Sequence, residues 1–419
     1  MRRIVTLSLS AVLVASGAVS ANWPSWRGPS ANGLSGETNL PVTWSPTENI
    51  AWKLALPQWS GATPIIWDDT IFLNVAEADL DTLSLWAVSR PNGTVLWKRP
   101  LSTGNNKQRK QNMSSPSPVT DGTTVWASTG TGFIRAFDFA GRERWVRDIQ
   151  KDYGRFGLNW GYASSPLLLE GDLIVPVLHG MKTDDPSYIL RIDGKTGRTK
   201  WKVERPNTAI RESPDAYITP ALAKVGSRSE IVITGADVVT GHDPATGREL
   251  WRAHGLNPRN NPAYRIVASP VTHGDIVIAP TRERPMLALK AGGRGDVTAT
   301  HTLWHFNNGP DVPTPVTDGT HVYVITDRGV VYCLELATGR TVYGPQRLAP
   351  GTYSSSPVLA DGKIYVASED GVFSVFRAGP SFELLAANEM DDYTLSSVAI
   401  KNGQLFLRTA GWLWAVGSN

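Results

Sequence analysis

Short runs of alternating apolar and polar residues, bounded by Gly and Asp, follow one another along most of the chain. Residues 355–387 show the pattern in four consecutive runs, "SSPVLAD", "KIYVAS", "VFSVFRA" and "FELLAA", with Asp-Gly turns at 361–362 and 370–371. A period of two places successive side chains on opposite faces of a strand, and the turns are short. The pattern therefore predicts four antiparallel strands joined as a meander.

This four-strand unit recurs along the chain. Each copy begins with a small residue and a proline before the first apolar run, as in "SPVTDG", "TPALAKVGS" and "SPVLADGK"; the last copy has Val in place of Pro. The anchors are Pro64, Pro118, Pro166, Pro220, Pro270, Pro315, Pro357 and Val398, spaced 41 to 54 residues apart. Such a period is typical of a β-propeller with one blade per unit. We predict an all-β fold, an eight-bladed β-propeller of four-stranded antiparallel blades, over residues 50–419.

A second phrase, Asp-x-x-Thr-Gly-x-x-x-Trp, falls between the third and fourth strands of a unit. It is clearest in "RIDGKTGRTKW", ending at Trp201, and in "GHDPATGRELW", ending at Trp251. The Gly can adopt the positive φ of a tight turn, and the indole that opens the fourth strand can wedge against the neighbouring blade. The predicted docking residues are Trp52, Trp97, Trp145, Trp201, Trp251 and Trp304, with Tyr343 and Leu384 or Leu385 at the two remaining positions.

The two ends of the chain predict how the ring closes. The last unit offers only three strands, "LSSVAI", "QLFLRT" and "WLWAV". An unpartnered strand, "IAWKLAL", stands upstream of the first unit and carries Trp52 at the fourth-strand position. We expect this N-terminal strand to complete the final blade, which leaves no open edge at the seam of the ring.

The first 21 residues predict export. Arg2 and Arg3 precede an apolar stretch that is too short for a membrane span, and "VSA" provides a small-residue cleavage site. We predict a cleavable signal peptide over residues 1–21, an extended segment over 22–49 that packs on the propeller, and a periplasmic or secreted protein. The segment contains no cysteine for a lipid anchor.

Charge and cysteine content narrow the function classes. Without Arg2 and Arg3, 39 basic residues stand against 38 acidic ones, a balance that favours neither nucleic acid nor insertion into a membrane. The one cysteine, Cys333, lies in an apolar run and is interpreted as a buried structural thiol. We expect a monomer.

The Trp-ending phrase resembles the repeat of pyrroloquinoline quinone (PQQ) repeat propellers. That superfamily includes the quinoprotein alcohol dehydrogenases and the lipoprotein of the β-barrel assembly machinery, and the resemblance covers roughly residues 50–419. For the dehydrogenases it implies a Ca²⁺ ion, a catalytic Asp and usually a ring of adjacent cysteines under the quinone. This sequence has no Cys-Cys pair and no C-x-x-C-H haem motif. We expect no cofactor and no catalytic residue. The alternative hypothesis is a quinone-dependent oxidoreductase, which would bind PQQ and Ca²⁺.

The loops that lead into the first strands carry the candidate site, because in a propeller they gather around one mouth of the channel. They mix charged and aromatic residues, which suits a ligand or peptide surface on a rigid scaffold. The candidates are Arg155, Asn159, Trp160, Tyr162, Arg211, Glu212, Asp215, Tyr264, Arg265, Arg282, Arg284, Asp391 and Asp392. The sequence favours a non-catalytic scaffold that binds a protein partner or small ligand here, with outer-membrane protein assembly as a further alternative.

Overall fold

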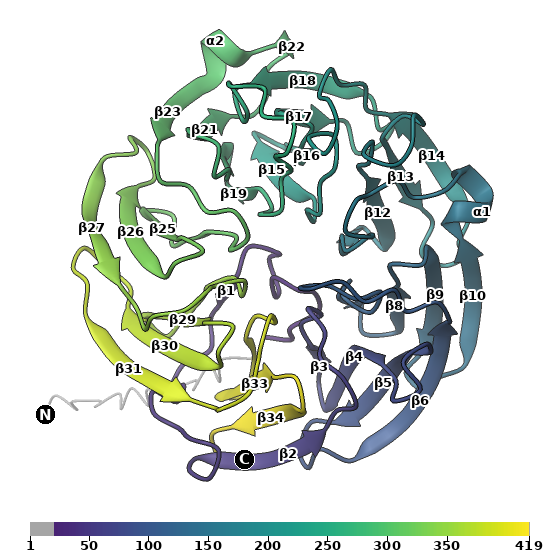
Figure 1. The fold of residues 1–419 in the computed structure, drawn as a ribbon, viewed down its shortest axis with the longest axis vertical. Helices are drawn as coiled ribbons and strands as arrows, with labels where there is room; N and C mark the ends of the chain where they lie inside the picture. Colours follow the sequence, from purple (N-terminus) through teal and green to yellow (C-terminus); the bar gives the residue numbers. More distant parts are fainter. Residues whose placement is uncertain (1–20, 419) are drawn as a thin grey trace, which may run out of the picture.

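The computed structural model describes residues 21–418, which form a closed ring of eight sheets around a central channel (Figure 1). In seven blades the four blade strands follow one another outward, antiparallel and in sequence order, and in the eighth the outer strand comes from the N-terminal part of the chain. The predicted eight-bladed β-propeller is therefore confirmed. The predicted signal peptide lies outside the described residues apart from Ala21.

The first four blades use consecutive strands. Their bounds are Ile65–Trp67, Thr70–Ala76, Leu83–Ser89 and Val95–Ser102 (β3–β6); Val119–Thr120, Thr124–Ser128, Phe133–Asp138 and Glu143–Asp148 (β7–β10); Leu167–Leu169, Asp172–Val177, Tyr188–Ile192 and Thr199–Glu204 (β11–β14); Ala221–Val225, Arg228–Gly235, Val238–His242 and Glu249–His254 (β15–β18).

The last four blades contain one interruption and the seam. Their bounds are Val271–His273, Ile276–Ala279, Met286–Lys290 and Thr302–Phe306 (β19, β20, β21, β23); Val316–Thr317, His321–Ile325, Val330–Glu335 and Thr341–Arg347 (β24–β27); Val358–Ala360, Lys363–Ala367, Val372–Arg377 and Leu384–Glu389 (β28–β31); Ala399–Lys401, Gln404–Arg408, Trp412–Val416 and Ile50–Ala55 (β32, β33, β34, β2).

Position in the blade decides how each strand is patterned. In blade 3 the middle strands β12 and β13 are buried at every residue, because adjacent blades cover both faces of the sheet. The outer strand β14, "TKWKVE", alternates half-buried and exposed residues. The alternation read from the sequence is therefore strongest at the rim, and the core lies between the blades.

The seam joins the two ends of the chain. Strand β2 pairs antiparallel with β34, with Trp52 opposite Ala415 and Leu54 opposite Leu413. The predicted closure by the N-terminal strand is confirmed. Two short strands extend other blades in parallel: β1 (Leu34–Ser35) beside β28, and β22 (Gly295–Asp296) beside β18.

The helices among the described residues are two short turns. α1 (Ile149–Tyr153) follows the outer strand of blade 2, and α2 (Thr298–His301) follows β22 in an excursion between the third and fourth strands of blade 5. Neither is long and apolar enough to cross a bilayer.

Five of the six indoles reach the third-to-fourth hairpin of the next blade. Each donates its Nε1–H to a backbone carbonyl there and covers the hairpin glycine, on which an added Cβ would lie 2.5–2.9 Å from the ring. The pairs are Trp52 with Gly93, Trp97 with Gly141, Trp145 with Gly197, Trp201 with Gly247, and Trp304 with Gly339.

Trp251 departs from this arrangement. Its ring is fully buried over Gly241 of its own blade, where an added Cβ would lie 2.1 Å away, and its Nε1–H donates to Glu230 at 2.7 Å. Glu230 also accepts the N–H of Gly292 in blade 5 at 3.1 Å, so the carboxylate links the two blades beside the β18–β22 pairing. The physical reason lies in blade 5, where the β22–α2 excursion replaces the tight glycine hairpin that receives the other indoles.

Candidate functional site

A belt of hydrogen bonds lines the channel. The residue before each anchor position is Ser or Thr in all eight units. In seven of the eight steps around the ring, its side-chain oxygen accepts the backbone N–H of the equivalent residue in the preceding blade. The donor-to-acceptor pairs are Thr63 to Ser117, Ser117 to Ser165, Thr219 to Ser269, Ser269 to Thr314, Thr314 to Ser356, Ser356 to Ser397, and Ser397 to Thr63, at 2.9–3.2 Å.

The N-terminal segment closes one end of the channel. Trp23 pairs with Ile66 of blade 1, and the buried Arg27 donates to the carbonyls of Pro315 and Pro357, both at 2.8 Å. Burial without a carboxylate partner lowers the pKa of Arg27 to about 9. Trp26, next to it, donates to the belt residue Ser397 at 3.4 Å. The segment therefore ties blade 1 to blades 6 and 7 and leaves the Trp26 indole in the channel.

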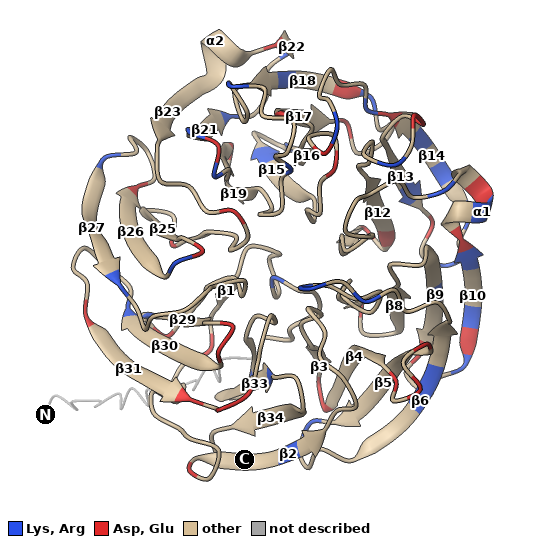
Figure 2. Ribbon diagram, viewed as in Figure 1, with Lys and Arg blue, Asp and Glu red and all other residues tan. Residues whose placement is uncertain are grey.

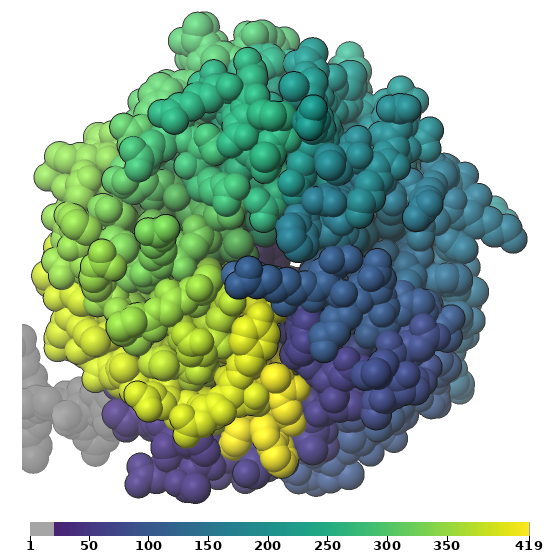
Figure 3. Space-filling view, in the orientation of Figure 1, coloured from purple at the N-terminus to yellow at the C-terminus, as the bar shows by residue number. Residues whose placement is uncertain are grey.

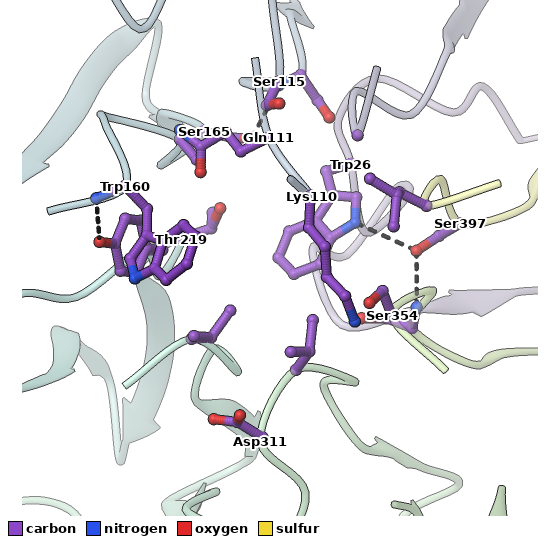
Figure 4. A pocket seen from close by; sticks show the side chains of 18 of the residues that line it. Trp26, Lys110, Gln111, Ser115, Trp160, Ser165, Thr219, Asp311, Ser354 and Ser397 are labelled. Atoms are coloured by element: carbon purple, nitrogen blue, oxygen red, sulfur yellow. Dashed lines mark hydrogen bonds between the residues drawn. The ribbon is translucent and has the colours of Figure 1, made fainter. Parts of the chain in front are cut away.

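The other end of the channel is hollowed into a cavity of about 400 Å³. Figure 3 shows this hollow, with N-terminal atoms in purple at its base. Trp26 and Trp160 face each other across it (Figure 4). The lining side chains that carry charge or large aromatic rings are Trp26, Arg109, Lys110, Trp160, Tyr217, Arg265, Asp311 and Asp327.

One wall of the cavity is held by two carboxylates, the half-buried Glu212 and the buried Asp215. The indole of Trp160, 36% exposed, donates to Glu212 at 2.7 Å, and its backbone N–H donates to the Tyr217 hydroxyl at 3.2 Å. Behind them Asp215 is fully buried and accepts the N–H groups of Asn159 at 2.6 Å and Met181 at 3.1 Å. Burial raises the pKa of Asp215 to about 6, against the lowering effect of these bonds. The wall is thus preorganised.

A loop of blade 2 crosses the mouth as a strap, which we define as residues 103–115. It reaches toward the centre of the ring in Figure 3, and in the ribbon of Figure 2 its Lys and Arg positions are blue. Lys110 pairs with Glu369 of blade 7 at 2.6 Å, and Lys107 lies over the ring of Trp59, 5.4 Å from its centroid. The strap therefore covers part of the cavity and is held by contacts at two places.

The remaining charged groups of the cavity are partly paired. Arg282 binds Asp311 at 2.7 Å, and burial raises the pKa of Asp311. Asp327 accepts the N–H groups of Asp311 and Val312 at 3.0 and 2.9 Å. The buried Nε of Arg265 lies 3.5 Å from Glu212 Oε1, which makes an ion pair but no hydrogen bond, and it has no hydrogen-bond partner among the described residues.

The structure separates the predicted site residues into three groups. Trp160 and Arg265 line the cavity, with Asn159, Glu212, Asp215 and Arg282 supporting it from behind. Tyr162 and Tyr264 are buried packing residues under the loops. The exposed residues outside the lining are Arg155, Arg211, Arg284 and Asp391, while the half-buried Asp392 accepts the N–H of Gly411 at 2.9 Å.

Sequence reasoning missed most of the cavity. Trp26 was assigned to a packing segment, and Lys110, Gln111, Asp311 and Asp327 were not chosen. The strap loop was a usable signal, since its length and basic residues exceed what a connection between blades requires. No pattern along the chain points to Trp26, because its place in the channel depends on the path of the N-terminal segment.

The donor set of the cavity does not fit Ca²⁺ with a quinone. Ca²⁺ takes six to eight oxygen ligands, several of them carboxylates. Among residues 21–418 no three His, Cys, Asp or Glu side chains converge to hold a metal. Of the two lining carboxylates, Asp311 pairs with Arg282 through one oxygen and keeps the other without a partner among the described residues, and Asp327 accepts two backbone N–H groups, so they fall short of such a set. The single cysteine is buried in β26, away from the lining.

These features define a β-propeller whose channel is closed at one end and hollowed into a cavity at the other. The chain belongs to the PQQ-repeat family described as outer membrane protein assembly factor BamB, whose profile matches residues 34–158, 157–300 and 293–379. The resemblance found in the Trp-ending repeat is therefore confirmed. No curated protein sequence matches the chain significantly.

Solved structures of the same fold come from two kinds of protein. BamB from Moraxella catarrhalis superposes with a TM-score of 0.60 and 16% identity, covering 87% of this chain and 96% of its own. A europium-containing methanol dehydrogenase has a TM-score of 0.70 and 12% identity, covering 94% and 90%. The quinohemoprotein alcohol dehydrogenase from Comamonas testosteroni has a TM-score of 0.65 and 12% identity, covering 95% and 81%. At these identities the likeness shows the fold alone.

Proposed function

We propose that this protein is an exported, non-catalytic propeller that binds a small ligand or a protein partner at the mouth of its channel. The observation that carries the proposal is the cavity of about 400 Å³, which has a tryptophan on each of two sides and preorganised loops around it. Small-molecule sites have this size and this mixture of aromatic and polar groups. The ring supplies a rigid frame, and the part of the chain that the structure describes contains no group of three metal-ligating side chains.

The test is reconstitution of the purified protein with PQQ and Ca²⁺. We expect no absorbance from bound quinone and no reduction of a redox dye with alcohols or sugars. Turnover would overturn the non-catalytic part of the proposal. Export is tested on protein isolated from its own cells, where the mature chain should begin near Asn22; an intact N-terminus would contradict it.

Family membership favours a second candidate, a role in outer-membrane protein assembly, because the matching family carries that description. The propeller would then present its mouth to a protein partner. Co-purification with named components of the barrel-assembly machinery, lost in a variant with a changed mouth such as Trp160→Ala, would support this role. If no component of the barrel-assembly machinery co-purifies with the protein under mild conditions, the assembly role is contradicted.

A further inference from the structure

The serine hydroxyls around the cavity keep their own protons available. Ser117, Ser165 and Ser356 line the cavity, and each uses its oxygen to accept a backbone N–H within the belt. No described residue accepts a hydrogen bond from these three hydroxyls. Because a hydroxyl that accepts can still donate, the belt offers O–H donors to a molecule in the cavity.

Two buried N–H groups add to this surplus of donors. The amide Nε2 of Gln111 and the Nε of Arg265 are both buried and make no hydrogen bond to a residue of 21–418, although the Arg265 Nε lies 3.5 Å from Glu212 Oε1 as an ion pair. Both residues line the cavity. A buried donor without a hydrogen bond destabilises the folded state. A ligand that accepts hydrogen bonds from these groups removes that cost and therefore binds more tightly.

The acceptors of the cavity are mostly used. Asp327 accepts two backbone N–H groups, and Glu369 accepts from Lys110. Asp311 pairs through one oxygen with Arg282, which leaves its other buried oxygen as an unpaired acceptor. Arg109, exposed in the strap, forms no ion pair with a described residue. The lining therefore favours a ligand that brings acceptors.

Building on the proposed non-catalytic binding function, we propose that the cavity is a metal-independent site for a small organic anion. Its oxyanion group accepts hydrogen bonds from Arg265, Gln111 and the belt serines. Its apolar part lies against Trp26 and Trp160, which face each other across the cavity (Figure 4). A guanidinium fork matches the geometry of carboxylate, sulfonate and phosphate oxygens, and indole faces favour flat apolar groups.

The experiment compares two fluorescent probes that differ in one charged group. 8-Anilino-1-naphthalenesulfonate carries a sulfonate, and N-phenyl-1-naphthylamine is its neutral parent; both are titrated with the full chain in the presence of EDTA. We expect the sulfonate probe to bind at one site at least about tenfold more tightly, since one charge-assisted hydrogen bond contributes roughly that factor. Arg265→Gln should weaken the sulfonate probe about tenfold or more and leave the neutral probe unchanged.

Matched variants keep the result decisive. Arg198→Gln removes an exposed arginine from a hairpin outside the cavity lining and should change neither probe. Arg109→Gln alters an exposed strap residue without risk to folding and should weaken only the sulfonate probe. Equal affinity for the two probes, loss of sulfonate binding in EDTA, no sulfonate binding at all, or an unchanged Arg265→Gln protein would each overturn the inference. Quinone-dependent turnover, by contrast, would overturn the proposed function itself.

Discussion

Two neighbouring junctions of the ring begin from the same sequence phrase and are built differently. Between blades 3 and 4, Trp201 reaches the next hairpin, donates to the carbonyl of Pro244 at 3.1 Å and covers Gly247. Between blades 4 and 5, the Trp251 ring stays within its own sheet, and blades 4 and 5 are joined by Glu230 and by the pairing of β22 with β18. The sequence phrase therefore specifies the strand that carries the tryptophan, and the structure of the next blade decides on which side the indole packs.

The difference has two visible causes. Blade 5 has no Thr-Gly hairpin to receive an indole, because its third and fourth strands are joined by β22 and α2. The residue opposite Trp251 on β17 is Gly241, whereas Ala87 and Ala136 stand opposite Trp97 and Trp145. A side chain at 241 would occupy the space of the ring. An indole thus docks outward or inward according to which glycine makes room.

The largest effect should come from Trp251→Ala. The ring is fully buried, and its loss also removes the indole donor from the buried Glu230 carboxylate. We expect the free energy of unfolding to fall by about 4 kcal/mol, against about 2 kcal/mol for Trp201→Ala at the half-buried junction. Urea denaturation of the two variants measures both values. Equal losses would show that the two junctions are energetically alike.

Asp215 holds the mouth end of the junction between blades 3 and 4 and should make stability depend on pH. Burial raises its folded-state pKa to about 6, above the ordinary value of 3.8. The folded state therefore binds the proton more tightly, and this contribution is full below about pH 4 and lost as pH rises through 6. The change corresponds to about 3 kcal/mol.

Asp215→Asn provides the control for that pH dependence. The variant cannot titrate, so the difference in unfolding free energy between wild type and variant should change by about 2 kcal/mol between pH 4 and pH 7, most of the full effect. Other titrating groups cancel in this difference. A constant difference across the range would mean that Asp215 keeps its ordinary pKa.

Gly247→Ala tests the outward-docked junction directly. An added Cβ would lie 2.6 Å from the Trp201 ring, and φ is +74°. We expect a loss of about 2 kcal/mol. Gly362→Ala is the matched control, since its φ is +64° but nothing lies within 4 Å of the added Cβ, and it should cost about 1 kcal/mol from backbone strain alone. Thermal melts of both proteins separate the indole contact from the backbone.

The belt offers a smaller contrast between two threonines. Thr314 accepts the N–H of Ser269 at 2.9 Å, whereas Thr219, at the same belt position, accepts no N–H from a described residue. Thr314→Val should cost about 1 kcal/mol because a buried N–H loses its partner, and Thr219→Val should change stability little. Thermal melts of the two isosteric variants measure the difference. Equal melting temperatures would mean that the belt hydrogen bonds do not stabilise the junctions between blades.

The smallest effect on stability should come from the strap. Lys110→Ala breaks an ion pair whose lysine is 38% exposed, so we expect a loss of about 0.5 kcal/mol or less. Hydrogen exchange of residues 105–112 should nevertheless accelerate, because the pair with Glu369 ties the strap to blade 7. Unchanged exchange would mean that the remaining strap contacts, including Asn112 to the Trp59 carbonyl, hold it alone.

Much of the fold could be predicted and little of the cavity. Strand alternation and the anchor period predicted eight blades and the closure through Trp52, since both are repeated local features. Of the cavity lining, Trp160 and Arg265 were predicted because they lie in long loops at first-strand positions. Lys110 and Asp311 were missed because the polarity of a loop does not show whether it faces the cavity. Arg211 and Asp391 lie in equally polar loops and are exposed outside the lining.

The amino-acid sequence by itself determined the number of blades, their strands and the seam, because these depend on periodic side-chain faces and turns a few residues long. Only the tertiary structure decided the path of the N-terminal segment, where Arg27 meets carbonyls 288 and 330 residues away. It also decided the inward turn of Trp251 and the polar groups that share the cavity. Those contacts join residues far apart in the chain, and their geometry exists only once the ring has closed.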